Sequence, residues 1–281
     1  MSPAIQNILL SLFFILSISL PLKAQENLDL NKMVLISLNS REDIYDINWP
    51  GSIKDIPSYE FKDCIDLVSV NIAEGVETIG EYAFLGCENL KRVSLPSTLK
   101  TIGEGAFREC NSLESLIIPE GVKIIPAYLC EFDENLISVR LPAGLEDIQR
   151  NAFAFCTNLE NIDIPESVIH IGSNAFNDCK SLKEINLPKK MHELESYAFA
   201  GCSNLKKVVL PENDNMLGEL LFTGCDNIEE IVCLSENPPV FDCNSPLFDP
   251  LENEIISRCR LIVLPESEQK FREAPVWSLF F

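Results

Sequence analysis

Two histidines, His170 and His192, are the side chains best suited to acid–base or metal chemistry at neutral pH. Neither belongs to a known catalytic motif, because the sequence contains no H-E-x-x-H, G-x-S-x-G, P-loop or dinucleotide-binding pattern. Carboxylates are plentiful, but their number alone is no case for a glycosidase. We expect the two histidines to be separate, solvent-exposed side chains. The sequence predicts no catalytic residue, no cofactor and no metal ligand.

The 11 cysteines are the second chemically active group. Seven of them recur at multiples of 23 residues: Cys64, Cys87, Cys110, Cys156, Cys179, Cys202 and Cys225. If stacked units repeat every 23 residues, equivalent Cβ atoms lie roughly 4.8 Å apart. A disulfide needs about 3.5–4.5 Å and converging bonds, so we predict seven buried free thiols. Cys-x-x-Cys spacing is absent, which argues against zinc. The sequence allows one disulfide among Cys233, Cys243 and Cys259 and does not decide whether it forms.

The same period organises the rest of the chain. A proline recurs at Pro50, Pro96, Pro119, Pro142, Pro165, Pro188 and Pro211, with Ala73 breaking the series. A phenylalanine recurs at Phe61, Phe84, Phe107, Phe153, Phe176, Phe199 and Phe222. Eight units therefore fit between Pro50 and Cys233 without an insertion or deletion. A fixed short period of this kind indicates a solenoid.

Each unit has two halves. The first half, L-x-x-V-x-L-P, ends with period-two alternation, which predicts a strand that the proline terminates. The strands are expected to begin at Ile44, Leu67, Leu90, Leu113, Leu136, Leu159, Leu182, Leu205 and Ile228, with one more at Leu261 to Leu264. In the second half, V-x-x-I-G-E-x-A-F-x-x-C, apolar residues lie three or four apart. This spacing predicts a short 3₁₀ or α turn.

These two motifs resemble the BspA-like class of bacterial leucine-rich repeats, over about Ile44 to Cys233. The resemblance implies a right-handed leucine-rich-repeat solenoid, with a parallel β-sheet on one face and short 3₁₀ or α turns on the other. It also implies a secreted or surface-displayed binding protein, whose partner is a host matrix protein or another cell-surface protein, and it implies no catalytic residues.

The chain ends lie outside the period. Residues 1–24 are predicted to be a secretory signal peptide, because an apolar run precedes Lys23-Ala24. We assign 25–49 to an N-terminal cap, 50–233 to the eight repeats and 234–281 to a C-terminal cap. The protein is therefore expected to be exported, to an extracellular, cell-surface or periplasmic location, without membrane insertion after cleavage. A net charge of −21 argues against nucleic acid and anionic lipid as partners.

Two units depart from the pattern. In the unit 119–141, Leu129 and Cys130 take the Ala-Phe positions, Asp133 takes the cysteine position and Pro126 takes the glycine position. Structural drift explains these changes, and a local kink or pocket is the functional alternative. In the next irregular unit, Asp214 lies in the run E-N-D-N, where a polar turn is favoured over a calcium site because no known calcium-loop spacing is matched.

The exposed face of the sheet is the candidate binding surface. Its side chains are the x positions of L-x-x-V-x-L, where several bases and two isoleucines gather in an otherwise acidic chain. Apolar and arginine side chains are enriched at the centres of protein interfaces. The predicted partner-binding residues are Lys91, Arg92, Ile117, Ile137, Arg140, Asn161, Lys183, Lys206 and Lys207.

Three function classes were considered, and no site in the sequence supports an enzyme. Two classes therefore remain. The first is a non-enzymatic adhesion or recognition protein that binds a protein or peptide through the sheet face. The second is a structural scaffold that polymerises through the ends of the solenoid. The sequence does not fix the ligand, the anchoring mode or the oligomeric state.

Overall fold

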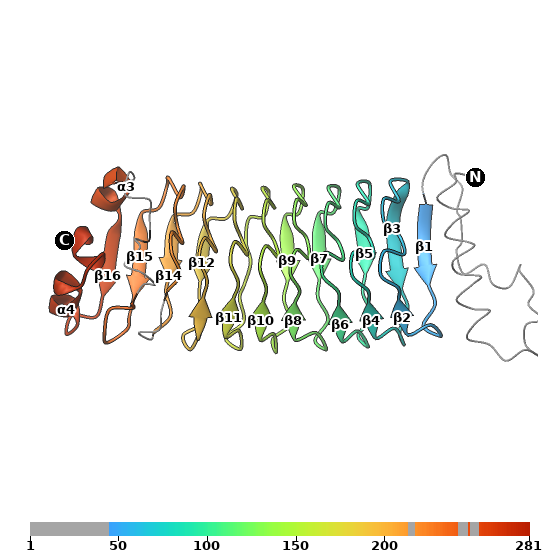
Figure 1. The fold of residues 1–281 in the computed structure, drawn as a ribbon, viewed down its shortest axis with the longest axis horizontal. Coiled ribbons are helices and arrows are strands. Elements are labelled where there is room, and N and C mark those ends of the chain that lie inside the picture. Colours follow the sequence, from blue (N-terminus) through green and yellow to red (C-terminus); the bar gives the residue numbers. More distant parts are fainter. Residues whose placement is uncertain (1–44, 213–216, 241–246, 248–252) are drawn as a thin grey trace, which may run out of the picture.

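The computed structural model describes residues 45–212, 217–240, 247 and 253–281. Over these residues the chain winds into a solenoid, with β1 at one end and the C-terminal helices at the other (Figure 1). We call one 23-residue turn of the solenoid a rung. The predicted signal peptide, nearly all of the N-terminal cap, Asp214 and Cys243 lie outside the described residues.

The first row of strands is the predicted sheet. It comprises β1 (Tyr45–Trp49), β3 (Leu67–Ile72), β5 (Arg92–Ser94), β7 (Ser115–Ile117), β9 (Ser138–Arg140), β12 (Glu184–Asn186), β14 (Lys207–Val209), β15 (Glu230–Cys233) and β16 (Arg260–Val263). The strand pairings of the described residues are parallel, and within the repeats the register is 23 residues, as in Ser115↔Ser138. The additional strand predicted near Leu261 is present as β16, paired with β15.

One predicted strand is missing. The rung that starts at Leu159 keeps only a single bridge, between Asn161 and Ser138. Asn161 and Asp163 flank the buried Ile162, and both residue types are depleted in strands. The Ile162 side chain therefore still enters the core, but the backbone of this rung does not pair as a strand. This loss separates β7-β9 from β12-β14-β15-β16, and a second break separates β1-β3-β5 from β7-β9.

A second row of two-residue strands runs beside the first (Figure 1), and the sequence did not predict it. It consists of β2 (Asp55–Ile56), β4 (Thr78–Ile79), β6 (Thr101–Ile102), β8 (Ile124–Ile125), β10 (Asp147–Ile148), β11 (His170–Ile171) and β13 (Glu193–Leu194). The isoleucine of the second half-unit therefore stacks in a parallel ladder. The predicted short turns begin only after these strands, as at residues 81–86, where Leu85 N–H donates to Tyr82 O.

The turns that follow do not continue into helices, because two positions per rung have left-handed backbone. One position runs from Tyr59 (φ 62°) to Leu220 (φ 49°), and the other runs from Asp63 (φ 58°) to Gly224 (φ 71°), each at 23-residue steps. A left-handed residue interrupts a right-handed helix. At one of these positions, Gly105, a Cβ atom would meet the Tyr82 ring at 2.3 Å, so a larger residue there would have to displace that ring.

These left-handed positions create a dense backbone ladder between rungs. The N–H groups of Tyr59, Phe61 and Asp63 donate to the carbonyls of Glu81, Ala83 and Leu85 at 2.7–2.9 Å. The same three bonds recur at every step through the rung of Tyr197, Phe199 and Gly201. The intervening N–H groups close i→i−3 turns, as Lys62 does onto Tyr59. Backbone polar groups on this side are thus satisfied without a helix.

Stacked aromatic rings and thiols fill the core behind this ladder. Phe61 and Phe84 lie 5.0 Å apart between ring centroids, and Phe176 and Phe199 lie 5.2 Å apart. The repeat cysteines from Cys87 to Cys225 each donate their Sγ–H to the carbonyl 26 residues earlier, as Cys87 does to Phe61 at 3.0 Å. The prediction of free thiols is confirmed for all seven repeat cysteines, of which Cys64 alone is half-buried. Cys233 and Cys259 are also free and buried.

The C-terminal cap covers the last rung. After β16 come the helix α4 (Glu268–Glu273) and the 3₁₀ helix η2 (Trp277–Phe280), and α3 (Asn253–Arg258) precedes β16. Phe271 and Trp277 are buried against each other, and Trp277 Nε1 donates to the Pro239 carbonyl at 2.9 Å. Within the described segments, no helix has the length and apolar character needed to cross a bilayer.

The irregular unit 119–141 is filled without a kink. Leu129 replaces a small alanine and Cys130 replaces a large phenylalanine, and both side chains are fully buried. The ladder continues through this rung, since Phe107 N–H donates to Leu129 O at 3.0 Å and Cys130 N–H donates to Ala152 O at 2.9 Å. The two changes compensate in volume, which supports structural drift over a pocket at Cys130.

We predict that restoring only the phenylalanine destabilises the protein. Cys130→Phe should overpack the core against Leu129 and lower the free energy of unfolding by about 1–3 kcal/mol. The double variant Leu129→Ala with Cys130→Phe restores the usual pair and should recover most of that loss. Urea unfolding followed by circular dichroism measures both. Additive effects of the two substitutions would contradict volume compensation.

Candidate functional site

The sheet strands place the predicted binding residues in three parallel lines along the solenoid. Residues immediately before a strand form one line, with Lys91, Ile137, Lys183 and Lys206. Residues at the strand start form a second line, with Arg92, Asn161 and Lys207. Ile117 and Arg140 belong to a third, and they are register partners in β7 and β9. All nine are solvent-accessible, Lys207 only partly.

Ion pairs divide this face into two regions. Toward the C-terminus, Lys183 Nζ lies 2.9 Å from Glu160, and Lys206 Nζ lies 3.4 Å from Glu229. Lys207 lies between Glu184 at 3.7 Å and Glu230 at 3.9 Å. These exposed pairs contribute little stability, but they cancel the local positive charge.

The opposite region keeps its positive charge. Within the described part of the chain, Lys91, Arg92 and Arg140 form no ion pair. Two exposed isoleucines lie among them, Ile117 with 61% of its surface accessible and Ile137 with 47%. The isoleucines occupy neighbouring rungs, three positions apart along the strand direction, which corresponds to about 10 Å. We call Lys91, Arg92, Ile117, Ile137 and Arg140 the cationic–apolar patch.

A shallow groove runs along the edge of this patch. It has a volume of about 530 Å³, and its lining includes Lys91 and Ile137. The other lining side chains are polar or acidic: Ser112, Glu114, Asn135, Asn158, Glu160 and Ser181. Lys91 also lines an adjoining hollow of about 390 Å³ with Arg92 and Ser115. The groove therefore offers hydrogen-bonding groups and two carboxylates beside an apolar side chain and one cation, Lys91, that has no ion pair among the described residues.

His170 is where sequence reasoning failed. The ring is half-buried in β11, its Nδ1 lies 2.5 Å from Asp147 Oδ1 and its Nε2 lies 3.1 Å from Glu195 Oε1. Burial lowers the pKa of His170, but the bonds to the two carboxylates outweigh it and the net pKa is raised. The prediction of a lone exposed histidine was wrong for His170, whereas His192 is exposed as predicted. The missed signal is that 147, 170 and 193 are 23 residues apart.

An aromatic and arginine cluster lies on the turn side of the irregular unit. Arg150 lies over the Tyr128 ring at 5.1 Å, and Arg108 lies over the rings of Tyr128 and Phe132 at 5.8 and 5.6 Å. Arg108 Nε also lies 2.7 Å from Glu131 Oε2. These contacts link adjacent rungs, which gives the cluster a structural role.

Asp133 brings a carboxyl into the core of the same unit. Its side chain is fully buried at a cysteine position, and Oδ1 accepts the N–H of Cys110 at 2.7 Å. Burial raises the pKa of Asp133 well above its usual value of 3.8, against the lowering effects of the Cys110 N–H and the Cys130 thiol. Burial therefore favours the neutral form of this carboxyl.

We predict a pH-dependent gain in stability when Asp133 is replaced. Because the pKa of Asp133 is raised in the folded protein, the carboxyl ionises first in the unfolded chain as the pH increases. The free energy of unfolding of wild type therefore falls above about pH 4, and it falls further as the pH approaches the folded pKa. Asp133→Asn keeps an acceptor for Cys110 but cannot ionise. Its free energy of unfolding relative to wild type should rise as the pH increases above about 4, by up to about 1.4 kcal/mol per pH unit, until the pH reaches the folded pKa.

Urea titrations at several pH values test this prediction, and Asp133→Cys, which restores the usual residue, is the companion variant. Both variants should show the same upward trend relative to wild type. Parallel pH profiles for wild type and Asp133→Asn would show that the buried carboxyl ionises normally.

Comparisons with known proteins agree with this architecture. The family model described as the BspA type leucine rich repeat region matches in six copies, over residues 38–156 and 123–240. The match spans more than half of the chain, and the protein therefore belongs to the BspA-type leucine-rich repeat family. No curated protein is a significant match.

Solved bacterial structures share the fold. A leucine-rich repeat protein from Bacteroides ovatus is 24% identical with a TM-score of 0.54, the alignment covering 78% of this chain and 62% of that one. A leucine rich cell surface protein from Faecalibacterium prausnitzii is 24% identical with a TM-score of 0.51, covering 68% and 61%. This chain thus spans about three fifths of those two proteins, and the likeness establishes the fold.

Proposed function

We propose that this protein is an exported, non-enzymatic recognition module that binds a protein or peptide through the cationic–apolar patch. The observation that carries the proposal is the coincidence of three unpaired cations with two exposed isoleucines beside a groove. Arginine and apolar side chains are the types enriched where interfaces are most strongly bound. The cell-surface relative from Faecalibacterium prausnitzii and the predicted signal peptide support export.

The charges indicate the chemistry of the partner. The protein carries a net charge of −21, so most of its surface repels acidic molecules. Lys91, Arg92 and Arg140 are not neutralised, in contrast to Lys183, Lys206 and Lys207 on the same face. A partner segment that combines carboxylates with an apolar side chain fits this region, and we propose an extended peptide segment of that composition.

The alternative scaffold that polymerises through its ends is less well supported. The apolar end of the last rung is covered by the C-terminal cap, where Phe271 and Trp277 are buried. End-to-end stacking at that side would require displacing the cap. Light scattering that rises with protein concentration would favour the scaffold over the recognition module.

Substitution of the two exposed isoleucines tests the proposed surface. Peptides selected from a displayed random library on the immobilised wild-type protein are titrated into purified variants by calorimetry. Ile117→Asp with Ile137→Asp should weaken binding about 30-fold or more, corresponding to about 2 kcal/mol, while leaving the core intact. Both side chains point away from the core, so thermal unfolding should match wild type.

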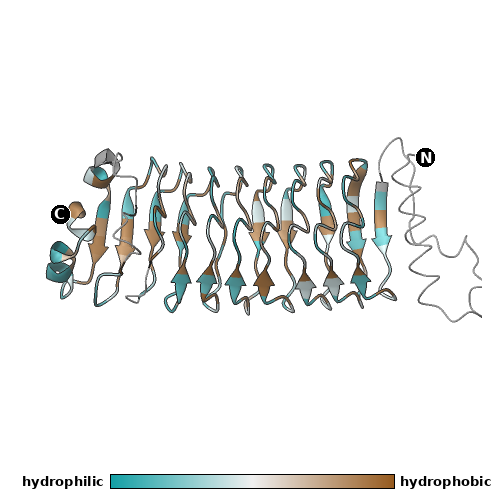
Figure 2. Ribbon diagram, viewed as in Figure 1, coloured by the Kyte–Doolittle hydropathy of each residue, from teal (hydrophilic) through white to brown (hydrophobic). Residues whose placement is uncertain are grey.

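Ile124→Asp is the matched control. Ile124 is 46% exposed, against 47% for Ile137, but it lies in β8 of the second row. Figure 2 shows β8 as an apolar arrow among more polar neighbours of that row. This variant should bind the peptides like wild type. Unchanged affinity of the folded double variant, or equal losses in Ile124→Asp, would contradict the proposed surface.

A further inference from the structure

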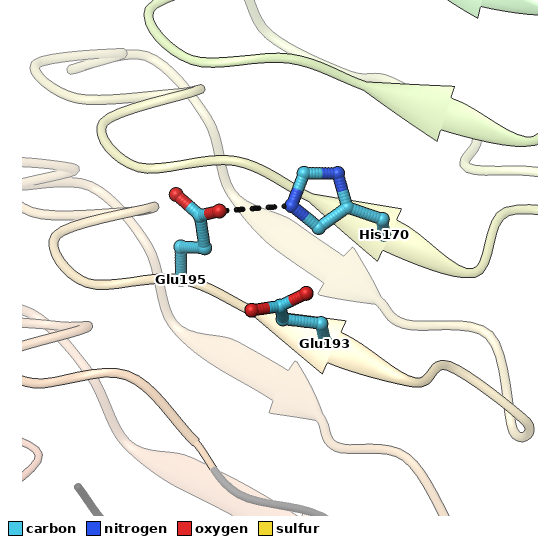
Figure 3. Close-up of side chains that lie close together, drawn as sticks. All are labelled: His170, Glu193 and Glu195. Carbon is cyan, nitrogen blue, oxygen red and sulfur yellow. Dashed lines mark hydrogen bonds and ion pairs between the residues drawn. The ribbon is translucent and has the colours of Figure 1, made fainter.

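We propose that His170, Glu193 and Glu195 form a binding site for a divalent transition-metal ion, with Zn²⁺ the ion that best fits the ligand set. One ligand atom from each of the three side chains lies within 4.8 Å of the other two. Figure 3 shows the imidazole and both carboxylates directed toward a common space from two adjacent rungs. The proposal is independent of the sheet face, because these residues belong to the second row of strands and its following turn.

The fold brings the three ligands together by register. His170 in β11 and Glu193 in β13 are partners in the parallel ladder, so their side chains leave the same face of neighbouring rungs. Glu195 lies two residues further along the rung of Glu193, which returns its side chain to the same face. Rung spacing of roughly 4.8 Å is bridged by side chains of this length.

Glu195 occupies a position where the two neighbouring rungs have glycine. These residues are Gly172 and Gly218, where a Cβ would lie 2.6 Å from Arg150 N and 2.2 Å from Ser196 N. At Glu195 the carboxylate extends back over the preceding rung, where Oε2 accepts the N–H of Ser173 at 2.8 Å. That bond leaves Oε1 directed at His170 Nε2. The carboxylate is thus held in place by the backbone.

Asp147 orients the imidazole for metal binding. Its Oδ1 accepts a hydrogen bond from Nδ1 of His170 at 2.5 Å, from the rung on the other side. Metal-bound histidines in proteins use this arrangement, in which a carboxylate fixes the tautomer and leaves the second ring nitrogen for the ion. Asp147 is therefore a positioning residue, and Nε2 is the ligand atom.

The distances and atom types select the ion. Tetrahedral ligands at about 2.0–2.1 Å from Zn²⁺ lie about 3.4 Å from one another, close to the observed 3.1 Å between Nε2 and Oε1. The exposed Glu193 can close the remaining distance by a change of rotamer. An imidazole ligand favours Zn²⁺ over Mg²⁺ and Ca²⁺, which prefer oxygen only. Three protein ligands leave the fourth position for water or for a group of another molecule.

Calorimetric titration of the full mature chain with Zn²⁺ at about pH 8, where imidazole binds metal in its neutral form, tests the proposal. We expect one saturable equivalent that persists in excess Mg²⁺ and Ca²⁺. His170→Gln should weaken it at least about tenfold, as should Glu193→Gln combined with Glu195→Gln. Thermal unfolding in a chelator verifies that each variant is folded, and added Zn²⁺ should raise the melting temperature of wild type more than that of the His170 and glutamate variants.

His192→Gln is the matched control, because His192 is the other histidine of the sequence and is exposed outside the cluster. It should bind Zn²⁺ like wild type. Co²⁺ provides a second readout, since a site without cysteine gives no thiolate charge-transfer band. Absence of saturable binding, wild-type affinity in His170→Gln, or a thiolate band that accompanies the bound equivalent would each overturn the assignment.

Discussion

The structure depends on a backbone hydrogen-bond ladder whose donors all point to the next rung. Three N–H groups per rung, such as those of Tyr59, Phe61 and Asp63, reach carbonyls 22 residues ahead. This requires left-handed backbone at two positions per rung, which asparagine, glycine and several tyrosines supply at some energetic cost. The ladder fixes the rung spacing, and the spacing in turn stacks phenylalanine on phenylalanine and thiol on carbonyl.

The fold could be predicted from the sequence because a strict period constrains every unit at once. The proline, phenylalanine and cysteine series sufficed for the solenoid and for the free thiols, both of which are confirmed. The second row of strands could not be predicted from the sequence. Val76 and Ile79 lie three residues apart, and this spacing fits a helical turn as well as a short strand preceded by a loop. What decides between them is the pairing of Ile79 with Ile56 and Ile102, a contact between rungs that no local pattern reveals.

Side-chain interactions between rungs explain the other differences between the sequence-based predictions and the structure. The exposed bases of the sheet face were identified correctly as exposed, but single residues do not show that Lys183 meets Glu160 while Arg92 meets no acid. His170 was misjudged for the same reason, because Asp147 and Glu195 are 23 and 25 residues away. In the irregular unit, Leu129 and Cys130 look like loss of pattern, yet together they fill the space of an alanine and a phenylalanine.

The one-directional ladder gives the turn side of the solenoid an electrical polarity. Peptide dipoles aligned along an axis sum, as they do in a helix, so the turn side has a partial negative charge toward the first rung and a partial positive charge toward the last. The two ends of this side consequently need chemically different terminators. The C-terminal segment supplies an acceptor, because the Leu247 carbonyl receives the N–H group of Phe222 at 3.0 Å. The first rung needs donors instead, so a second copy of the C-terminal segment would not terminate it.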